Sequence, residues 1–110
     1  DDGAAGHAVH GKAALYSAQG ELDEAERLYL RARSLALQAG DSKLAALTAQ
    51  NLGVIACVRG ELEEARRHYE LCLAEYRTLG LARDVCVALT NLGKLHTAQR
   101  TWDAAHRAFA

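Results

Sequence analysis

A forty-residue internal repeat dominates the sequence. Residues 20–29 (GELDEAERLY) return as residues 60–69 (GELEEARRHY), and a weaker third copy follows at residues 101–109 (TWDAAHRAF). The triplet Asn-Leu-Gly at residues 51–53 likewise returns at residues 91–93. A fixed period in this range is typical of stacked supersecondary units, because each unit can bury its apolar face only against a neighbour. The repeat therefore predicts an extended stack of similar units instead of a closed globule.

Glycines spaced by twenty residues mark where helices should end. Each follows a stretch of helical apolar periodicity, and glycine adopts the left-handed conformation of a helix C-terminus without steric cost; they are Gly20, Gly40, Gly60 and Gly80. The pattern predicts helices at about 5–19, 22–39, 42–59, 62–79, 82–99 and 102–110. Asp41 and Ser42 are placed to cap the third of these. We expect one all-α domain over residues 1–110, with repeats at about 5–40, 42–80 and 82–110. Since the chain begins without methionine and stops inside a repeat, we interpret it as a segment of a longer protein.

The second helix of each pair carries a clear apolar stripe. Its members are spaced by three and four residues and so share one helix face: Leu22, Ala25, Tyr29, Ala32 and Ala36 in one copy, and Leu62, Ala65, Tyr69, Cys72 and Tyr76 in the next. On the opposite face we predict the ion pairs Asp23–Arg27 and Glu63–Arg67. Gly53 and Gly93 are predicted to remove side chains where two helices approach closely.

These positions resemble the tetratricopeptide repeat family. The family pattern is matched in the second repeat by Leu52, Gly53, Ala56, Gly60, Ala65, Tyr69 and Cys72. The corresponding residues are Lys12, Ala13, Tyr16, Gly20, Ala25, Tyr29 and Ala32 in the first repeat, and Leu92, Gly93, His96, Arg100, Ala105 and Phe109 in the third. Arg100 departs from the glycine of the pattern and leaves the third turn less well specified. The forty-residue period is similar to that of kinesin light chains, certain cell-polarity adaptors and bacterial regulators of the maltose-activator type. The resemblance implies a right-handed superhelical stack of about three antiparallel helix hairpins, the last one truncated.

The resemblance also implies a concave binding wall made by the first helix of each pair. Mapped onto this chain, its members are His7, His10, Ala14, Ser17, Leu47, Gln50, Asn51, Val54, Val58, Val87, Thr90, Asn91, Lys94 and Thr97. The resemblance implies that Asn51 and Asn91 match the asparagines with which related adaptors bind an extended peptide. Such a side chain can hold a peptide unit because its amide both donates and accepts hydrogen bonds. Two alternatives stay open: the apolar members pack against the neighbouring hairpin, and the asparagines bond to an adjacent helix or turn. Lys94 is the only cation on this wall, which disfavours a clamp for a terminal carboxylate.

Composition excludes several other function classes. The net charge is −1 and no basic stripe is present, which argues against nucleic-acid binding. The sequence has no apolar run of membrane-spanning length and no apolar h-region of the kind found in signal peptides, and its three cysteines suit a reducing compartment, so we expect a cytoplasmic protein. His68 and Cys72 lie four residues apart, but no closed set of four metal ligands is apparent. We therefore expect no metal, no cofactor and no enzymatic activity.

Three functions are compatible with this sequence. The first is a scaffold that binds a peptide or helix of a partner protein in the groove. The second is a sensor module of a bacterial signal-transduction or transcription regulator, which would bind a small effector or a neighbouring domain. The third is self-association through the apolar stripe of the last helix, formed by Trp102, Ala105 and Phe109.

Overall fold

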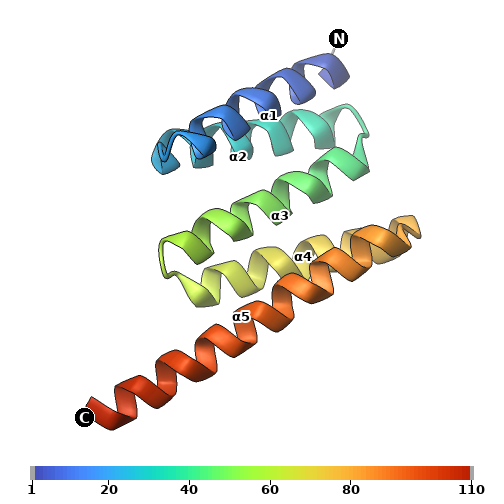
Figure 1. The fold of residues 1–110 in the computed structure, drawn as a ribbon. Helices are drawn as coiled ribbons and strands as arrows, with labels where there is room; N and C mark the ends of the chain where they lie inside the picture. The colour runs from blue at the N-terminus through green and yellow to red at the C-terminus, as the bar shows by residue number, and fades with distance from the viewer. Residues whose placement is uncertain (1, 110) are drawn as a thin grey trace.

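The computed structural model describes residues 2–109, with side chains from residue 4 to residue 108. All of the regular structure in this range is helical: α1 (Asp2–Ala18), α2 (Leu22–Gln38), α3 (Ser42–Val58), α4 (Leu62–Leu79) and α5 (Ala82–Phe109). The helices stack into an elongated body with extents of 54 × 32 × 17 Å (Figure 1). The predicted all-α stack of about three repeats is therefore confirmed.

The turns between helices use glycine as predicted. Gly20, Gly40, Gly60 and Gly80 all have positive φ, between 70° and 79°. The turns after α1 and α3 share one geometry: the amide after the glycine donates to a carbonyl five residues earlier, at 2.9 Å for Glu21 N to Tyr16 O and 2.8 Å for Glu61 N to Ala56 O. The predicted cap is also present, because Leu44 N donates to Asp41 Oδ1 over 3.0 Å.

Small residues and tyrosines build the interior between the helices. Ala25, Ala32 and Ala65 are completely buried, as the stripe on the second helices predicts. Tyr69 of α4 packs over Gly53 of α3, where an added Cβ would lie only 2.6 Å from Tyr69 Cε1. The predicted close approach at Gly53 is thus confirmed, and the absence of a side chain is what admits the tyrosine ring.

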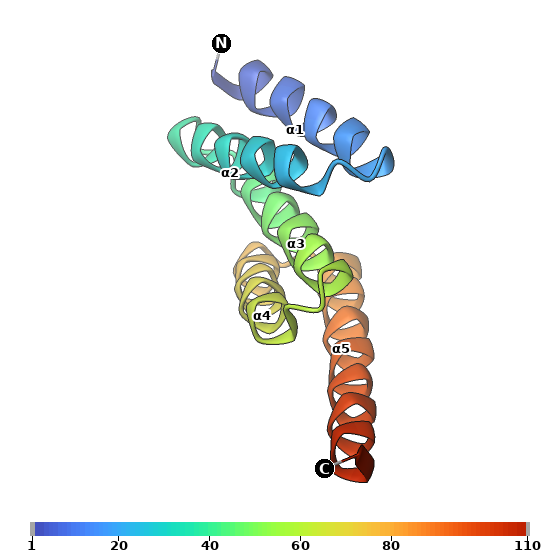
Figure 2. The same ribbon diagram turned by 90° about the vertical axis from the view of Figure 1, so that its left-hand side faces the viewer.

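The predicted break between residues 99 and 102 is wrong, because α5 continues as one helix of 28 residues to Phe109. Its C-terminal half extends away from the rest of the stack (Figures 1 and 2). Two local hydrogen bonds span the predicted turn: Gln99 Nε2 donates to Asp103 Oδ1, and Thr101 Oγ1 donates to Thr97 O, both over 3.0 Å. The glycine of the earlier turns is replaced by Arg100, and a residue with a Cβ disfavours the left-handed conformation.

The straight course of α5 overturns the prediction for Gly93. A Cβ at Gly93 would meet no atom within 4 Å, because no second helix packs over it. It also leaves the stripe of the last helix uncovered: Trp102 is 61% exposed and Ala105 is exposed, while the Phe109 side chain lies outside the described residues. The third repeat therefore differs from the first two in having no folded-back partner helix.

Candidate functional site

The predicted wall divides into half-buried and exposed members, and one exposed member, His7, is paired with Asp41 (Nε2 to Oδ2, 3.1 Å). The half-buried members are His10, Ser17, Leu47, Gln50, Asn51 and Asn91. The exposed members are His7, Ala14, Val54, Val58, Val87, Thr90, Lys94 and Thr97. The first group lies mostly on α1 and the N-terminal half of α3, whereas the second is richest on α5 and the C-terminal half of α3.

Asn51 and His10 bind each other. Asn51 Nδ2 lies 3.0 Å from His10 Nε2, across the contact between α3 and α1. The His10 ring also meets the edge of the Tyr29 ring, with 5.4 Å between centroids and an interplanar angle of 60°. Burial, and to a smaller degree the charge of His7, lower the pKa of His10, so its neutral ring accepts the hydrogen bond from the amide. Asn51 is therefore engaged with an adjacent helix, which is one of the alternatives that the sequence left open.

The half-buried histidines predict an acid-sensitive fold. Burial lowers the pKa of both His10 and His68 below that of a free histidine. As the pH falls through about 6.5, the unfolded chain takes up these protons before the folded chain does, so the free energy of unfolding decreases. We expect urea unfolding at pH 7, 6 and 5 to show this loss, and the His10→Gln variant to show less of it than the wild type. Substitution of the exposed His106 by glutamine is the control; an undiminished loss in the His10 variant would contradict the assignment.

Gln50 is held in place by a tyrosine of the next helix. Tyr76 Oη of α4 donates to Gln50 Oε1 over 3.1 Å. Burial raises the pKa of Tyr76 to about 12, so the phenol stays protonated and remains a donor. This bond uses the carbonyl oxygen of the Gln50 amide and leaves its NH₂ group for another acceptor. Gln50 and Asn91 are the forty-residue equivalents of His10 and Asn51, but glutamine replaces the histidine.

The exposed part of the wall, taken together with the half-buried Asn91, combines apolar and polar side chains. Val54 is 40% exposed, Val58 68% and Val87 41%. On the same helix as Val87, the half-buried Asn91 follows four residues later. The exposed Lys94 follows three residues after Asn91, so the three residues share one face. Thr90 and Thr97 hydrogen-bond instead to carbonyls four residues earlier in α5. We define the α3–α5 face as Val54, Val58, Val87, Asn91 and Lys94.

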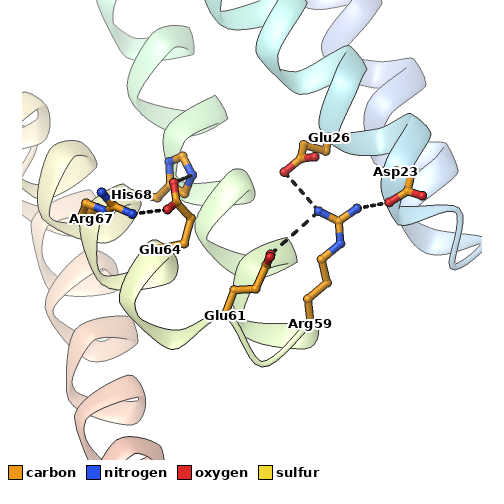
Figure 3. Close-up of polar contacts among 7 residues, drawn as sticks. All are labelled: Asp23, Glu26, Arg59, Glu61, Glu64, Arg67 and His68. Atoms are coloured by element: carbon orange, nitrogen blue, oxygen red, sulfur yellow. Dashed lines mark hydrogen bonds and ion pairs between the residues drawn. The ribbon is translucent and has the colours of Figure 1, made fainter.

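An ion cluster around Arg59 joins α2 to the turn between α3 and α4 (Figure 3). Arg59, just after α3, pairs with Asp23 and Glu26 of α2; Nη1 lies 3.1 Å from Glu26 Oε2 and 4.0 Å from Glu61 Oε1. The Arg59 side chain is only 21% exposed, and its planar group can serve several carboxylates at once. The cluster fixes the first hairpin against the second, which is a structural role.

The two predicted ion pairs on the second helices are wrong. Asp23 pairs with Arg59 instead of Arg27, which contacts Glu24. Arg66 pairs with Glu63 and Glu70. Arg67 pairs with Glu64 instead of Glu63, as Figure 3 shows. Spacing within one helix could not identify the Arg59 cluster, because its partners come from a neighbouring hairpin.

A hollow that the sequence did not predict lies between α4 and α5. Its volume is about 380 Å³, and its lining includes Leu62, Glu63, Arg66, Leu92, Leu95 and His96. None of the predicted wall residues lines it. The hollow adjoins a second one that reaches Gln99 and Trp102 beside the α3–α4 turn, so both follow the straight course of α5.

Cys72 is a packing residue of the interior and not an accessible thiol. Cys72 is fully buried, its thiol donates to Tyr69 O over 3.2 Å, and burial raises its pKa to about 11. Within the described part of the chain, no three histidine, cysteine, aspartate or glutamate side chains gather as they would around a metal ion. None of the five helices, as far as they are described, combines the length and the apolar character needed to cross a membrane.

Comparison with known families supports the repeat architecture. A family model described as "Tetratricopeptide repeat" matches residues 5–77, which is more than half of the chain and spans the hairpins α1–α2 and α3–α4. No curated protein matches the sequence.

Proposed function

The chain belongs to the tetratricopeptide repeat family, and from this premise we propose that it is a protein–protein interaction module that binds a partner segment on the α3–α5 face. Repeats of this family generally act as non-enzymatic interaction scaffolds. The proposal adds to that general role a location on this chain and a ligand chemistry.

The observation that carries the proposal is the contrast between the two parts of the wall. His10, Asn51 and Gln50 already have partners within the stack. Val54, Val58 and Val87 expose large apolar side chains on the first helices of two successive repeats, and exposed apolar groups of this kind are available to a partner. A partner segment with apolar side chains would bury these valines, as in other modes of peptide recognition in grooves.

The polar members of the face suggest how such a segment is oriented. The Asn91 amide offers a donor and an acceptor, so it matches one peptide unit of a bound backbone whatever its sequence. Lys94 lies three residues further along α5 and favours a single acidic side chain in the ligand. The proposed ligand is therefore an apolar segment with one carboxylate, and its affinity should rest mainly on the valines.

Selection from a random peptide library tests this proposal. We expect the selected peptides to bind the wild-type chain, and the Val58→Glu variant to raise their dissociation constant about tenfold or more by placing a charge in the apolar contact. Leu37→Glu is the matched control, because Leu37 is also exposed (55%) but lies on α2. Asn91→Ala should weaken binding to a smaller degree. Equal losses for Val58→Glu and Leu37→Glu would place the binding site elsewhere.

A further inference from the structure

The third repeat of this chain contains two uncovered apolar surfaces that match each other. We propose that residues 101–109 exchange between the straight end of α5 and a helix that folds back onto the α5 acceptor face of the same chain, with Arg100 as the hinge. The α5 acceptor face consists of Leu89, Gly93 and His96. This inference concerns the conformation of the chain and does not depend on the proposed ligand.

The first two repeats show which side chains pack on the positions equivalent to the α5 acceptor face. In the second repeat, Leu62 and Tyr69 of α4 pack with Ala56 of α3, and the Tyr69 ring covers Gly53. In the first repeat, Leu22 and Tyr29 of α2 pack in the same way with Val9 and Ala13 of α1. In the third repeat, Trp102 and Phe109 occupy the sequence positions of Leu62 and Tyr69. On the first helix of that repeat, Leu89, Gly93 and His96 occupy the positions of Ala49, Gly53 and Ala56.

In the straight form the described side chains of both sets are exposed to solvent. Leu89 is 45% exposed and Trp102 61%, and Gly93 would have no atom within 4 Å of an added Cβ. The second-repeat equivalents of Gly93 and Trp102 are covered: Gly53 lies under the Tyr69 ring, and Leu62 is half-buried. Folding back would bury Trp102 and place Phe109 over Gly93, in the arrangement that Leu62 and Tyr69 adopt in the second repeat.

Arg100 favours the straight form over the folded-back form. The turns at Gly20 and Gly60 need φ values of 79° and 77°, and Arg100 occupies the equivalent position. An arginine resists this left-handed conformation because its Cβ approaches the following carbonyl oxygen. The bonds of Gln99 to Asp103 and of Thr101 to Thr97 also exist only while the helix is continuous.

Helix geometry favours residues 101–109 of the same chain over those of a second copy. At 3.6 residues per turn, Leu89, Gly93 and His96 share one side of α5, whereas Trp102 and Ala105 point to roughly the opposite side. Two straight α5 helices related by a two-fold axis would present one side to each other, so they could not cover both sets reciprocally. A turn at residue 100 removes this conflict, because it reverses the chain and faces the second set toward the first.

Trp102 reports the exchange directly, since it is the only tryptophan of the 110-residue chain. Arg100→Gly removes the steric penalty of the turn and should raise the ratio of folded-back to straight chains about 5- to 30-fold. We expect its tryptophan emission to shift to shorter wavelength and acrylamide quenching to weaken. Arg100→Asn should act in the same direction, because asparagine tolerates the left-handed conformation. Arg107→Gly is the matched control, since it weakens the same helix without placing glycine at the turn.

A second substitution identifies the surface that is covered. Gly93→Leu, introduced into the Arg100→Gly variant, fills the recess that an aromatic ring would cover and should return quenching to the wild-type value. Protection that survives Gly93→Leu would overturn the proposal, as would unchanged quenching in both position-100 variants. Light scattering over a range of concentrations completes the test: protection that appears only with a doubled mass would assign the cover to a second copy and likewise overturn it.

Discussion

A leucine at position 53 is expected to reduce the free energy of unfolding by about 1–3 kcal/mol, the usual cost of overpacking a core. The first atom of the new side chain would already lie 2.6 Å from Tyr69 Cε1 and 2.7 Å from Tyr69 Cδ1. Tyr69 is only 4% exposed, so its ring cannot move aside into solvent. The ring and α4 must therefore shift away from α3, and the contacts of Ala56 and Leu95 in the same cluster are lost with them.

The matched control for Gly53→Leu is Gly11→Leu. Gly11 also lies inside a helix, but it is exposed and a Cβ there would meet no atom within 4 Å. Leucine should stabilise this position by about 0.5–1 kcal/mol, because glycine is a poor residue in a helix interior. Thermal unfolding followed by circular dichroism measures both changes. Equal melting temperatures for the two variants would contradict the assigned contact between Gly53 and Tyr69.

Local signals made the first four helices predictable from the sequence. The predicted range 22–39 is observed as Leu22–Gln38, and 62–79 is observed as Leu62–Leu79. Apolar periodicity and helix-ending glycines act over a few residues, so neither needs knowledge of distant contacts. The turn expected at residue 100 rested on the repeat alone, against a local sequence that lacks glycine. In the structure the local chemistry prevails, because continuing the helix avoids a strained arginine.

The candidate site was less predictable, because its state depends on how the hairpins stack. Asn51 was correctly placed on a first helix, but its partner His10 is 41 residues away. Arg59 finds Asp23 across 36 residues, although each residue has closer partners of opposite charge in the sequence. Side-chain pairing between helices follows from their relative position and rotation, which periodicity does not determine.

Tyr76→Ala is expected to have the largest effect on stability, a loss of about 3–5 kcal/mol, which is typical of removing a buried aromatic ring. Tyr76 is 1% exposed and is the largest of the fully buried side chains in the described part of the chain. Its ring packs in one cluster with Ala46 and Ala49 of α3 and Ala88 of α5. A cavity there removes contacts of two helix interfaces at once, and such a loss is a large fraction of the stability of a small domain.

Tyr76→Phe separates the ring from its hydroxyl group. The phenylalanine variant keeps the packing and loses only the hydrogen bond to Gln50, so we expect a cost of about 0.5–1.5 kcal/mol. Urea unfolding gives both free energies, and amide hydrogen exchange should show that α5 loses protection in Tyr76→Ala but retains it in Tyr76→Phe. A phenylalanine variant as unstable as the alanine variant would mean that the bond to Gln50, and not the ring, holds α3 and α4 together. In that case the hydrogen bond that fixes Gln50 would be the main contribution of Tyr76 to stability.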